Sequence, residues 1–357
     1  MQSSIMWQYI GQEPEVLSKL LQSSQTDEFA AEKGTGLKAV YFVAHGSSYN
    51  AAVCTLGFFS KYANVRAYAY TPGNFCSGCS AVAQEEPAST LVAVISQTGT
   101  SSGAIKALEY AASLGFSTLS ITAAGGSPVA VKADDSLDLM CGEEDSNAKT
   151  KGYSATLTLL LLLALSIGFR NGAVDTAEKQ AVISEISGMI HVIPEVSDKV
   201  LDFCKKTGFG ENMPNLYVLG SGINYGTALE GQLKLMETMC IPAMFNDIGE
   251  FSHGMHRSID AGSNVLLIKG CDEMKDQVEQ AYQYLKGITR YVWIIDAAGE
   301  ETGEPDRLLI PSFHRTQSVL LTTLAVQVMS VYAPELNGKD PNRNANDDFT
   351  VVAGTRT

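Results

Sequence analysis

The 357-residue sequence combines 45% hydrophobic residues with 18% charged residues and carries a formal net charge of −14. This length favours two domains, and the apolar content is sufficient for two sizeable cores. The negative charge argues against nucleic acid and anionic membranes as partners, although a helix terminus within an acidic protein can still bind an anionic metabolite.

The cysteine pattern and the apolar runs exclude two further classes. Seven cysteines, an odd number spread along the chain, do not form a disulfide framework. Cys76 and Cys79 form a lone CxxC after a loop signature, which favours plain reduced thiols over a redox or metal role. No signal peptide is evident, and the longest apolar run, residues 157–169, is too short to cross a bilayer. We therefore expect a cytoplasmic protein.

The first half of the chain alternates strands with helices. Residues 1–36 are expected to be a helical segment that packs on the first domain or on a partner subunit. Residues 37–172 are expected to be the first domain, an α/β/α sandwich with a mainly parallel sheet. Its strands are predicted at residues 38–44, 65–70, 91–95, 116–122 and 136–140, and its helices at 51–62, 103–113, 128–132 and 157–169.

The turn after the third of these strands is rich in hydroxyl groups. The stretch 91–102, LVAVISQTGTSS, is read as a buried strand, a tight turn and the first turn of a helix. Hydroxyls and backbone N–H groups at a helix N-terminus bind anions, and phosphate fits best. The turn lacks the lysine that a P-loop requires, and its glycine spacing is not that of a dinucleotide-binding fingerprint. On spacing alone, a Ser/Thr-rich helix cap that binds no ligand is an equally good interpretation of this stretch.

The second half repeats the pattern of the first. Residues 173–212 are expected to be a helical connector, 213–335 a second domain of the same flavodoxin-like class, and 336–357 a polar tail. FVAHGSSYNAA around Gly46 matches YVLGSGINYGTA around Gly220, which indicates an internal duplication. The second copy has Lys269-Gly270-Cys271-Asp272 in place of the serine cluster, so an anion site is predicted only in the first copy.

Several motifs in order resemble a known family. HGSSYN, SQTGTS and Thr150-Lys151 before a long helix resemble a first sugar isomerase (SIS) domain. ALEG with LKLME, followed by GEFSHG, resembles a second one. The sequence is similar to the isomerase half of glucosamine-6-phosphate synthase and to the fructosamine-6-phosphate deglycases, over roughly residues 35–345.

The resemblance implies roles for individual residues. Glu237 would move a proton between C1 and C2 of the open-chain sugar, and His253 would assist ring opening, within its own subunit or in that of a neighbour. Lys234 would lie near the reacting end. The remaining residues would hold the sugar 6-phosphate: Gly46, Ser48, Ser96, Gln97, Thr98, Ser101 and Lys151.

Simple physical chemistry is compatible with these roles. Lys234 and Glu237 are three residues apart on a predicted helix and share a face with Glu230. A carboxylate beside an apolar helix can have a raised pKa and act as a base. Without the surrounding motifs, a surface Glu–Lys pair would be the commoner interpretation. His256 competes with His253, and His45 is either a turn residue or a polar group at the mouth of the site.

Three departures bear on the reaction. The synthase has an N-terminal glutaminase domain with a nucleophilic cysteine at position 2, where this chain has Gln2. Thr100 replaces a usual glutamate, and Asn346 lies near the position of a tail lysine. We therefore expect an amino-sugar phosphate isomerase or a deglycase without glutaminase, metal or organic cofactor, with active sites shared in a homodimer or larger homo-oligomer. The alternatives are a sugar-phosphate sensor and, less favoured, a dehydrogenase.

Overall fold

A computed structural model describes residues 4–299 and 301–354, and the chain divides into two compact units. What we call the first unit contains the first predicted domain except for residues 145–150, and the second unit contains the second predicted domain. The first unit comprises Glu15–Glu144, Lys151–Ile183 and the tail from Asn344. The second unit comprises the described residues up to Pro14, Asp145–Thr150 and Ser184–Arg343. Helices α1 (Ile5–Gln22) and α8 (Thr176–Thr207) each contribute residues to both units.

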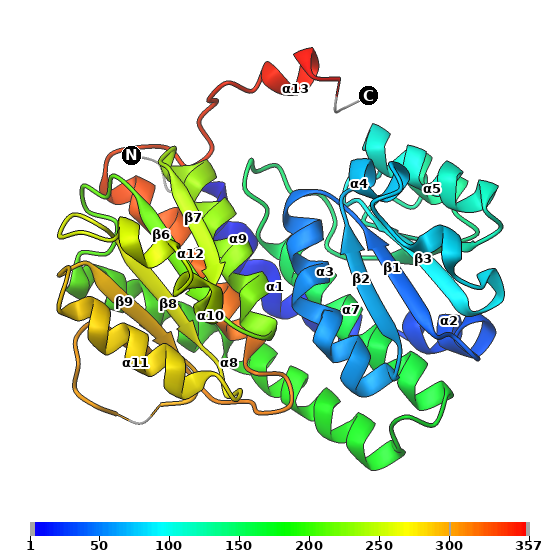
Figure 1. The fold of residues 1–357 in the computed structure, drawn as a ribbon, viewed down its shortest axis with the longest axis horizontal. Helices are drawn as coiled ribbons and strands as arrows, with labels where there is room; N and C mark the ends of the chain where they lie inside the picture. The colour runs from blue at the N-terminus through cyan, green and yellow to red at the C-terminus, as the bar shows by residue number, and fades with distance from the viewer. Residues whose placement is uncertain (1–3, 300, 355–357) are drawn as a thin grey trace. The chain divides into compact units, whose positions relative to one another are not determined.

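The first unit is built on a parallel five-stranded sheet with strand order β2-β1-β3-β4-β5 (Figure 1, blue to teal). The central strands β1 and β3 are buried along their whole length, as expected for strands covered on both faces. Its strands are β1 (Ala39–Val43), β2 (Arg66–Tyr70), β3 (Thr90–Ile95), β4 (Ser117–Thr122) and β5 (Asp135–Asp138).

The helices of the first unit include one that is buried almost throughout. Helix α7 (Lys151–Arg170) is buried from Lys151 to Gly168 and packs against α2 and α3, because it is apolar on all sides. It begins six residues before the predicted helix. The other helices are α2 (Gln25–Lys33), α3 (Gly46–Phe58), α4 (Pro72–Cys76), α5 (Ser102–Ser113), α6 (Pro128–Lys132) and α13 (Phe349–Val352), with single turns η1 (Phe59–Ala63), η2 (Val82–Gln84) and η3 (Pro87–Ser89).

The second unit repeats this topology. Its parallel sheet has the order β7-β6-β8-β9-β10, which is the same second-first-third-fourth-fifth order as in the first unit. The predicted pair of α/β/α domains and the internal duplication are thus confirmed. Its strands are β6 (Leu216–Gly220), β7 (Ala243–Asp247), β8 (Val265–Lys269), β9 (Val292–Asp296) and β10 (Arg307–Leu309).

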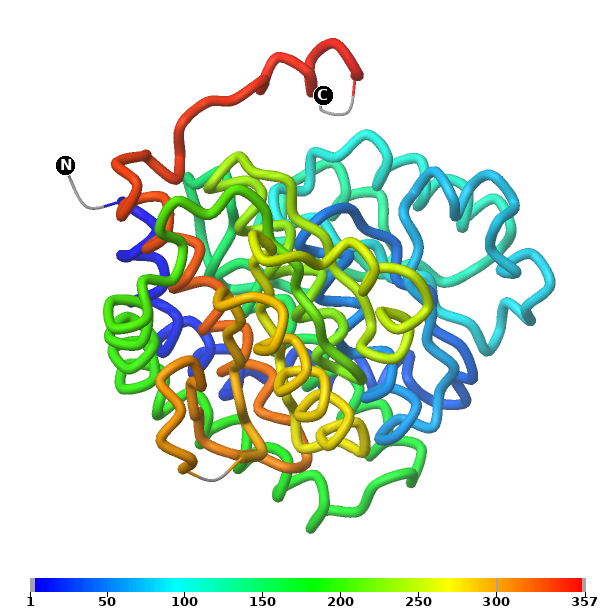
Figure 2. The backbone as a smooth tube through the Cα atoms, turned by 60° about the vertical axis from the view of Figure 1, so that its left-hand side comes forward, coloured from blue at the N-terminus to red at the C-terminus, as the bar shows by residue number. Residues whose placement is uncertain are grey.

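Helix α12 (Val319–Leu336) is the core helix of the second unit and packs against α9 (Ile223–Met239). Helices α7 and α12 are long and apolar enough to span a bilayer, but 94% and 83% of their apolar windows are buried inside the protein. The backbone N–H of Ser4 and the indole of Trp7 donate to Glu335, so the start of α1 lies beside the end of α12 (Figure 2). The unit also contains α10 (Ile248–Phe251), α11 (Lys275–Lys286) and η4 (Met255–Ser258).

The structure corrects several predicted elements. The edge strands β7 and β10 were not predicted, because β7 is only half-buried along its length and β10 has three residues. Residues 72–76, expected to be loop, form α4. The predicted helical connector contains a single 32-residue helix, α8, in agreement with the expectation of one or two helices.

Candidate functional site

The hydroxyl-rich turn of the first unit lies between β3 and α5. Ser101 is the N-cap of α5, and its side chain accepts a hydrogen bond from the backbone N–H of Ala104 at 3.4 Å. Gly99 has φ +67°, and a Cβ there would lie 1.9 Å from Ser127 Oγ, so the turn requires glycine at this point. The turn presents Ser96, Gln97, Thr98 and Ser101 at the N-terminus of a twelve-residue helix, where negative charge is stabilised.

A second turn lies beside the first. Strands β1 and β3 are parallel neighbours with Val43 opposite Val94, so the turns that follow them meet at one edge of the sheet. Gly46 and Ser48 stand in the first turn of α3. A Cβ on Gly103 in α5 would lie 3.0 Å from His45 Cε1, which shows how closely the two helix starts approach. Burial lowers the pKa of His45, which favours a neutral imidazole at this edge.

The side chain of Gln97 is held by a residue that the sequence did not single out. Its Nε2 donates to Glu144 Oε2 at 3.1 Å, and the backbone N–H of Gly152 donates to the same oxygen at 3.0 Å. Glu144 is 7% exposed. Lys151, a predicted phosphate ligand, begins α7 and is 5% exposed. The only sequence signal for Glu144 was its place in a charged loop after the last strand of the sheet.

In the second unit, three charged residues follow one face of α9. Lys234 Nζ lies 2.8 Å from Glu230 Oε1, and both side chains are fully buried. Lys234, which was predicted to lie near the reacting end of the sugar, thus forms an internal ion pair with Glu230. Glu237 stands at an exposed position, yet the protein around its carboxyl raises its pKa. Glu230 raises this pKa further, whereas the positive charges of Lys234 and Lys149 lower it.

Lys149 is the second residue that the sequence analysis missed. Its Nζ donates to the carbonyl of Ser146 at 2.8 Å, which holds the ammonium within the loop before α7. The effect of its charge on the pKa of Glu237 shows that the two groups lie near each other in the second unit. Its position directly before the predicted Thr150-Lys151 motif was the available signal.

The two histidines of the loop after α10 differ in their surroundings. His253 is exposed, and its backbone N–H donates to the carbonyl of Glu250 at 2.9 Å. The Nδ1 atom of His256 lies 3.2 Å from the carbonyl of Phe251, and its ring makes an edge contact with the Phe251 ring. His256 is therefore held by its own loop, whereas the His253 imidazole is accessible to a ligand.

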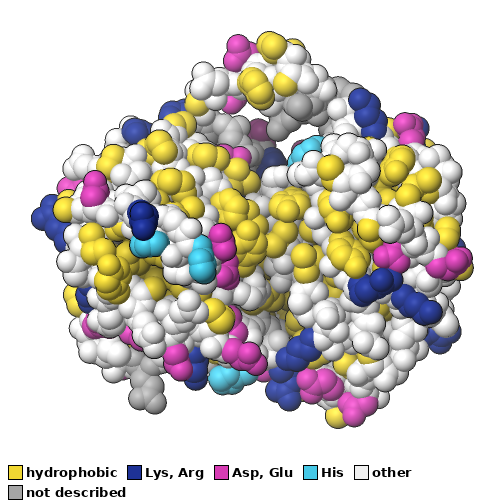
Figure 3. Space-filling view, in the orientation of Figure 1, with side chains coloured by type: hydrophobic (Ala, Val, Ile, Leu, Met, Phe, Trp, Pro, Cys, Tyr) yellow, Lys and Arg dark blue, Asp and Glu magenta, His cyan; other side chains and the backbone are white. Residues whose placement is uncertain are grey.

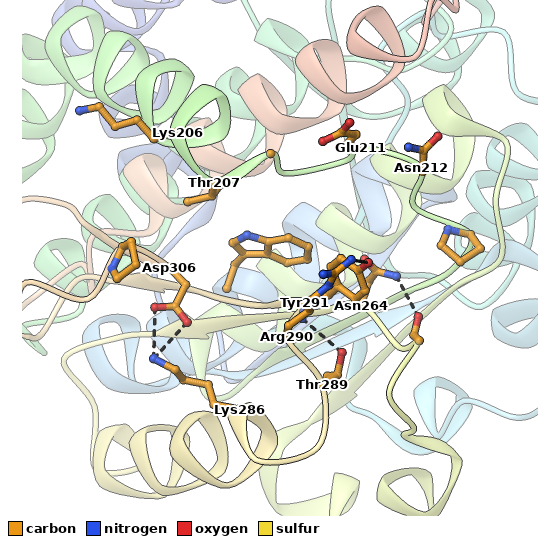
Figure 4. Close-up of a pocket in the computed structure, with 15 residues that line it drawn as sticks. Lys206, Thr207, Glu211, Asn212, Asn264, Lys286, Thr289, Arg290, Tyr291 and Asp306 are labelled. Atoms are coloured by element: carbon orange, nitrogen blue, oxygen red, sulfur yellow. Dashed lines mark hydrogen bonds and ion pairs between the residues drawn. The ribbon is translucent and has the colours of Figure 1, made fainter.

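A large cavity of the second unit contains none of the predicted site residues. It has a volume of about 930 Å³ and lies beside the amino ends of β8 and β9, with Trp293 in its wall and an ion pair between Lys286 and Asp306 (Figure 4).

On the molecular face in Figure 3, Lys and Arg side chains are scattered among acidic and uncharged ones. Among the described residues, no group of three or more His, Cys, Asp and Glu side chains could hold a metal ion.

The turns, the helix start and the acidic residue on α9 can now be compared with known proteins. The SIS domain model matches residues 37–166 and 211–329, which together make up more than half of the chain. The chain belongs to the SIS domain family. Both matched segments correspond to the two sheets and their covering helices, so the family and the duplicated fold agree.

Curated relatives include glutamine–fructose-6-phosphate aminotransferases. The Staphylococcus aureus (strain Mu50) protein is 27% identical over 335 residues, which cover 92% of this chain and 55% of the relative. The Symbiobacterium thermophilum protein is 30% identical over 264 residues, which cover 72% of this chain and 43% of the relative. The chain thus spans about half the length of the curated relatives it matches.

Solved structures share the fold. The C-terminal domain of a Francisella tularensis glucosamine-fructose-6-phosphate aminotransferase has a TM-score of 0.85 at 20% identity, covering 95% of this chain and 98% of that one. A Thermotoga maritima glucosamine-6-phosphate deaminase has a TM-score of 0.78 at 21% identity, covering 96% and 98%. The SIS chain is therefore related to the isomerase half of the aminotransferases and has the fold of phosphosugar enzymes.

Proposed function

We propose that this SIS protein is an enzyme that acts on an amino-sugar or fructosamine-type 6-phosphate by moving a proton between C1 and C2. The observation that carries the proposal is the hydroxyl-rich start of α5 in one SIS unit, in a chain whose other SIS unit has Glu237, with its raised pKa, on α9. The names of the relatives, which concern fructose 6-phosphate and glucosamine 6-phosphate, support this substrate class.

In the proposed complex, the first unit holds the phosphate. The backbone N–H groups at the start of α5 and the hydroxyls of Ser96, Thr98 and Ser101 donate to its oxygens, and Ser48 at the start of α3 adds a further hydroxyl. These groups can bind a dianion without a lysine in the turn. A bound phosphate fixes one end of the open-chain sugar and so limits the positions that C1 and C2 can take.

Glu237 is the proposed base. As a carboxylate it removes a proton from C1 of a ketose or ketoamine, and the electron pair of the C–H bond forms the C1–C2 double bond while a proton is taken up on O2. Return of a proton to C2, together with loss of the proton on O1, gives an aldose; from a ketoamine, loss of the proton on the C1 nitrogen gives a C1 imine. Water then adds to the imine carbon, and the amine leaves with a proton. An isomerase ends with the proton transfer, and a deglycase includes the hydrolysis.

His253 is the proposed acid–base group for ring opening. An accessible imidazole can donate a proton to the ring oxygen and accept the proton of the anomeric hydroxyl. Its exposed position in the loop after α10 suits a residue that reaches substrate in its own subunit or in a neighbouring one. We propose that active sites are shared in a homodimer or larger homo-oligomer. Lys149 and Lys234 supply positive charge near the base.

Proton exchange in heavy water tests this function. The protein is incubated with a fructosamine 6-phosphate, or with fructose 6-phosphate plus ammonia, and NMR follows exchange at C1 and C2, glucose 6-phosphate and free amine. We expect Glu237→Gln to slow exchange by at least 100-fold, since general-base catalysis contributes 10²–10⁴-fold.

The matched control is Glu195→Gln, an exposed glutamate on α8 that lies outside the site, and its exchange rate should equal that of the wild type. Exchange that survives Glu237→Gln would refute the base assignment. Tight binding of 6-phosphosugars without any exchange would instead favour a sugar-phosphate sensor.

A further inference from the structure

We propose that Glu144 is a positioning residue that sets the orientation of the Gln97 amide in the phosphate turn. This inference rests on the proposed function, because it treats Gln97 as a ligand of the sugar 6-phosphate. It adds a residue that no motif of the sequence indicated. All the groups involved belong to the first unit.

The geometry places one carboxylate oxygen between two donors. Glu144 Oε2 accepts a hydrogen bond from Gln97 Nε2 at 3.1 Å and another from the backbone N–H of Gly152 at 3.0 Å. Gly152 is the second residue of α7, so the carboxylate lies at a helix N-terminus, where its negative charge is stabilised. The side chain is 7% exposed, and a buried carboxylate with these partners has few other orientations.

The anchor determines which end of the Gln97 amide faces the substrate. An ionised carboxylate only accepts hydrogen bonds, so the amide nitrogen must point to Glu144. Gln97 Nε2 also lies 3.9 Å from Cys141 Sγ, a weak acceptor that a phosphate oxygen can replace, and Oε1 remains for a sugar hydroxyl. Without the anchor, the amide can turn its oxygen toward the phosphate, and two acceptors would repel each other.

Gly152 gives independent support because it leaves room for the amide. A Cβ at this position would lie 2.2 Å from Gln97 Nε2 and 2.3 Å from Oε1. The amide is the far end of a flexible side chain and can move aside. An alanine at 152 should therefore displace the amide from Glu144 while changing the stability of the fold little.

The test compares three variants in the full-length chain. Isothermal titration with fructose 6-phosphate and with glucose 6-phosphate measures Kd, and thermal unfolding measures Tm. We expect Glu144→Gln and Gly152→Ala to raise Kd about ten-fold, the effect of losing one hydrogen bond to a charged group. Their Tm should stay close to that of the wild type. Glu143→Gln, at the exposed neighbouring position, is the matched control and should leave Kd unchanged.

A double-mutant cycle separates positioning from a merely structural role. If Glu144 acts through Gln97, then Glu144→Gln should change Kd less than two-fold in a Gln97→Ala background. A ten-fold loss in that background, or unchanged Kd in Gly152→Ala, would overturn the inference. A wild-type chain that binds neither sugar phosphate would instead contradict the proposed function.

Discussion

The three charged residues on α9 show how burial separates groups of the same chemistry. Glu230 and Lys234 form a fully buried ion pair, whereas Glu237, one turn further along, is exposed and has a raised pKa. Helical spacing placed all three on one face, but it could not indicate which of them is covered by protein. Removal of one partner of a buried pair leaves an uncompensated charge, so Lys234 and Glu230 are best regarded as a unit that sets the potential near Glu237.

The pH dependence of the reaction follows from the pKa of Glu237. The base must be ionised, and desolvation by the protein around the carboxyl, together with the charge of Glu230, raises the pKa of Glu237 above the ordinary value of 4.5. Activity should therefore be lost as the pH falls through a value above 4.5, and kcat/KM against pH measures this limb. Since the charge of Lys149 lowers the pKa of Glu237, Lys149→Met should shift the limb to higher pH. A shift to lower pH would contradict the assignment.

At the scale of elements, the edge strand β10 illustrates how three residues can be held in a sheet. Arg307, its first residue, forms ion pairs with Asp296 of β9, with Glu279 of α11 and with Glu304 of the preceding loop. Lys269, the last residue of β8, joins Glu279 and Asp296 in the same network. Glu279 and Asp296 lie 28 and 11 positions before Arg307, and a three-residue strand held by such non-local partners leaves no local pattern that predicts it.

The network should make the second unit sensitive to acid. The Arg307 guanidinium and the Lys269 ammonium lower the pKa of Glu279 from its ordinary 4.5 to about 2. Its stabilising contribution is therefore complete above about pH 4.5 and is lost as the pH falls toward 2. We expect Glu279→Gln to lower the free energy of unfolding by about 1.5–3 kcal/mol at pH 7 and by much less at pH 2.

Urea unfolding at the two pH values measures this difference. The control is Asp276→Asn, at an exposed position on the same helix. Gln283 is left unchanged because its side chain contacts Glu279. An equal loss of stability at both pH values would show that packing, rather than charge, is responsible.

At the scale of the whole molecule, two copies of one fold have divergent turns. Both sheets have the same strand order, but β3 of the first unit is followed by Ser96 and the hydroxyl-rich turn, whereas β8 of the second unit ends at Lys269 in an internal ion-pair network. The second copy therefore lacks a hydroxyl-rich turn at this point, and it carries the proposed base on α9. Under the proposed function, the two copies have specialised: one binds phosphate and the other supplies the base.

Shared active sites can be tested by mixing two inactive variants. If His253 completes the site of a neighbouring subunit, Glu237→Gln and His253→Ala subunits mixed after dissociation should form heterodimers with one intact site. Random pairing in a dimer would restore about a quarter of the wild-type activity. No recovery would place both residues in the site of one subunit, and an active monomer in size-exclusion chromatography would refute the oligomer.

The sequence by itself determined the class of fold, the duplication and the family, because strand–turn–helix alternation and short motifs are local patterns. The SIS match and the two parallel sheets agree with that prediction. Only the tertiary structure decided how individual side chains are placed: the burial of Lys234, the proximity of Lys149 to Glu237 and the anchoring of Gln97 by Glu144, 47 positions apart. Burial and hydrogen bonding depend on neighbours that are remote in the chain, and periodicity and spacing contain no record of them.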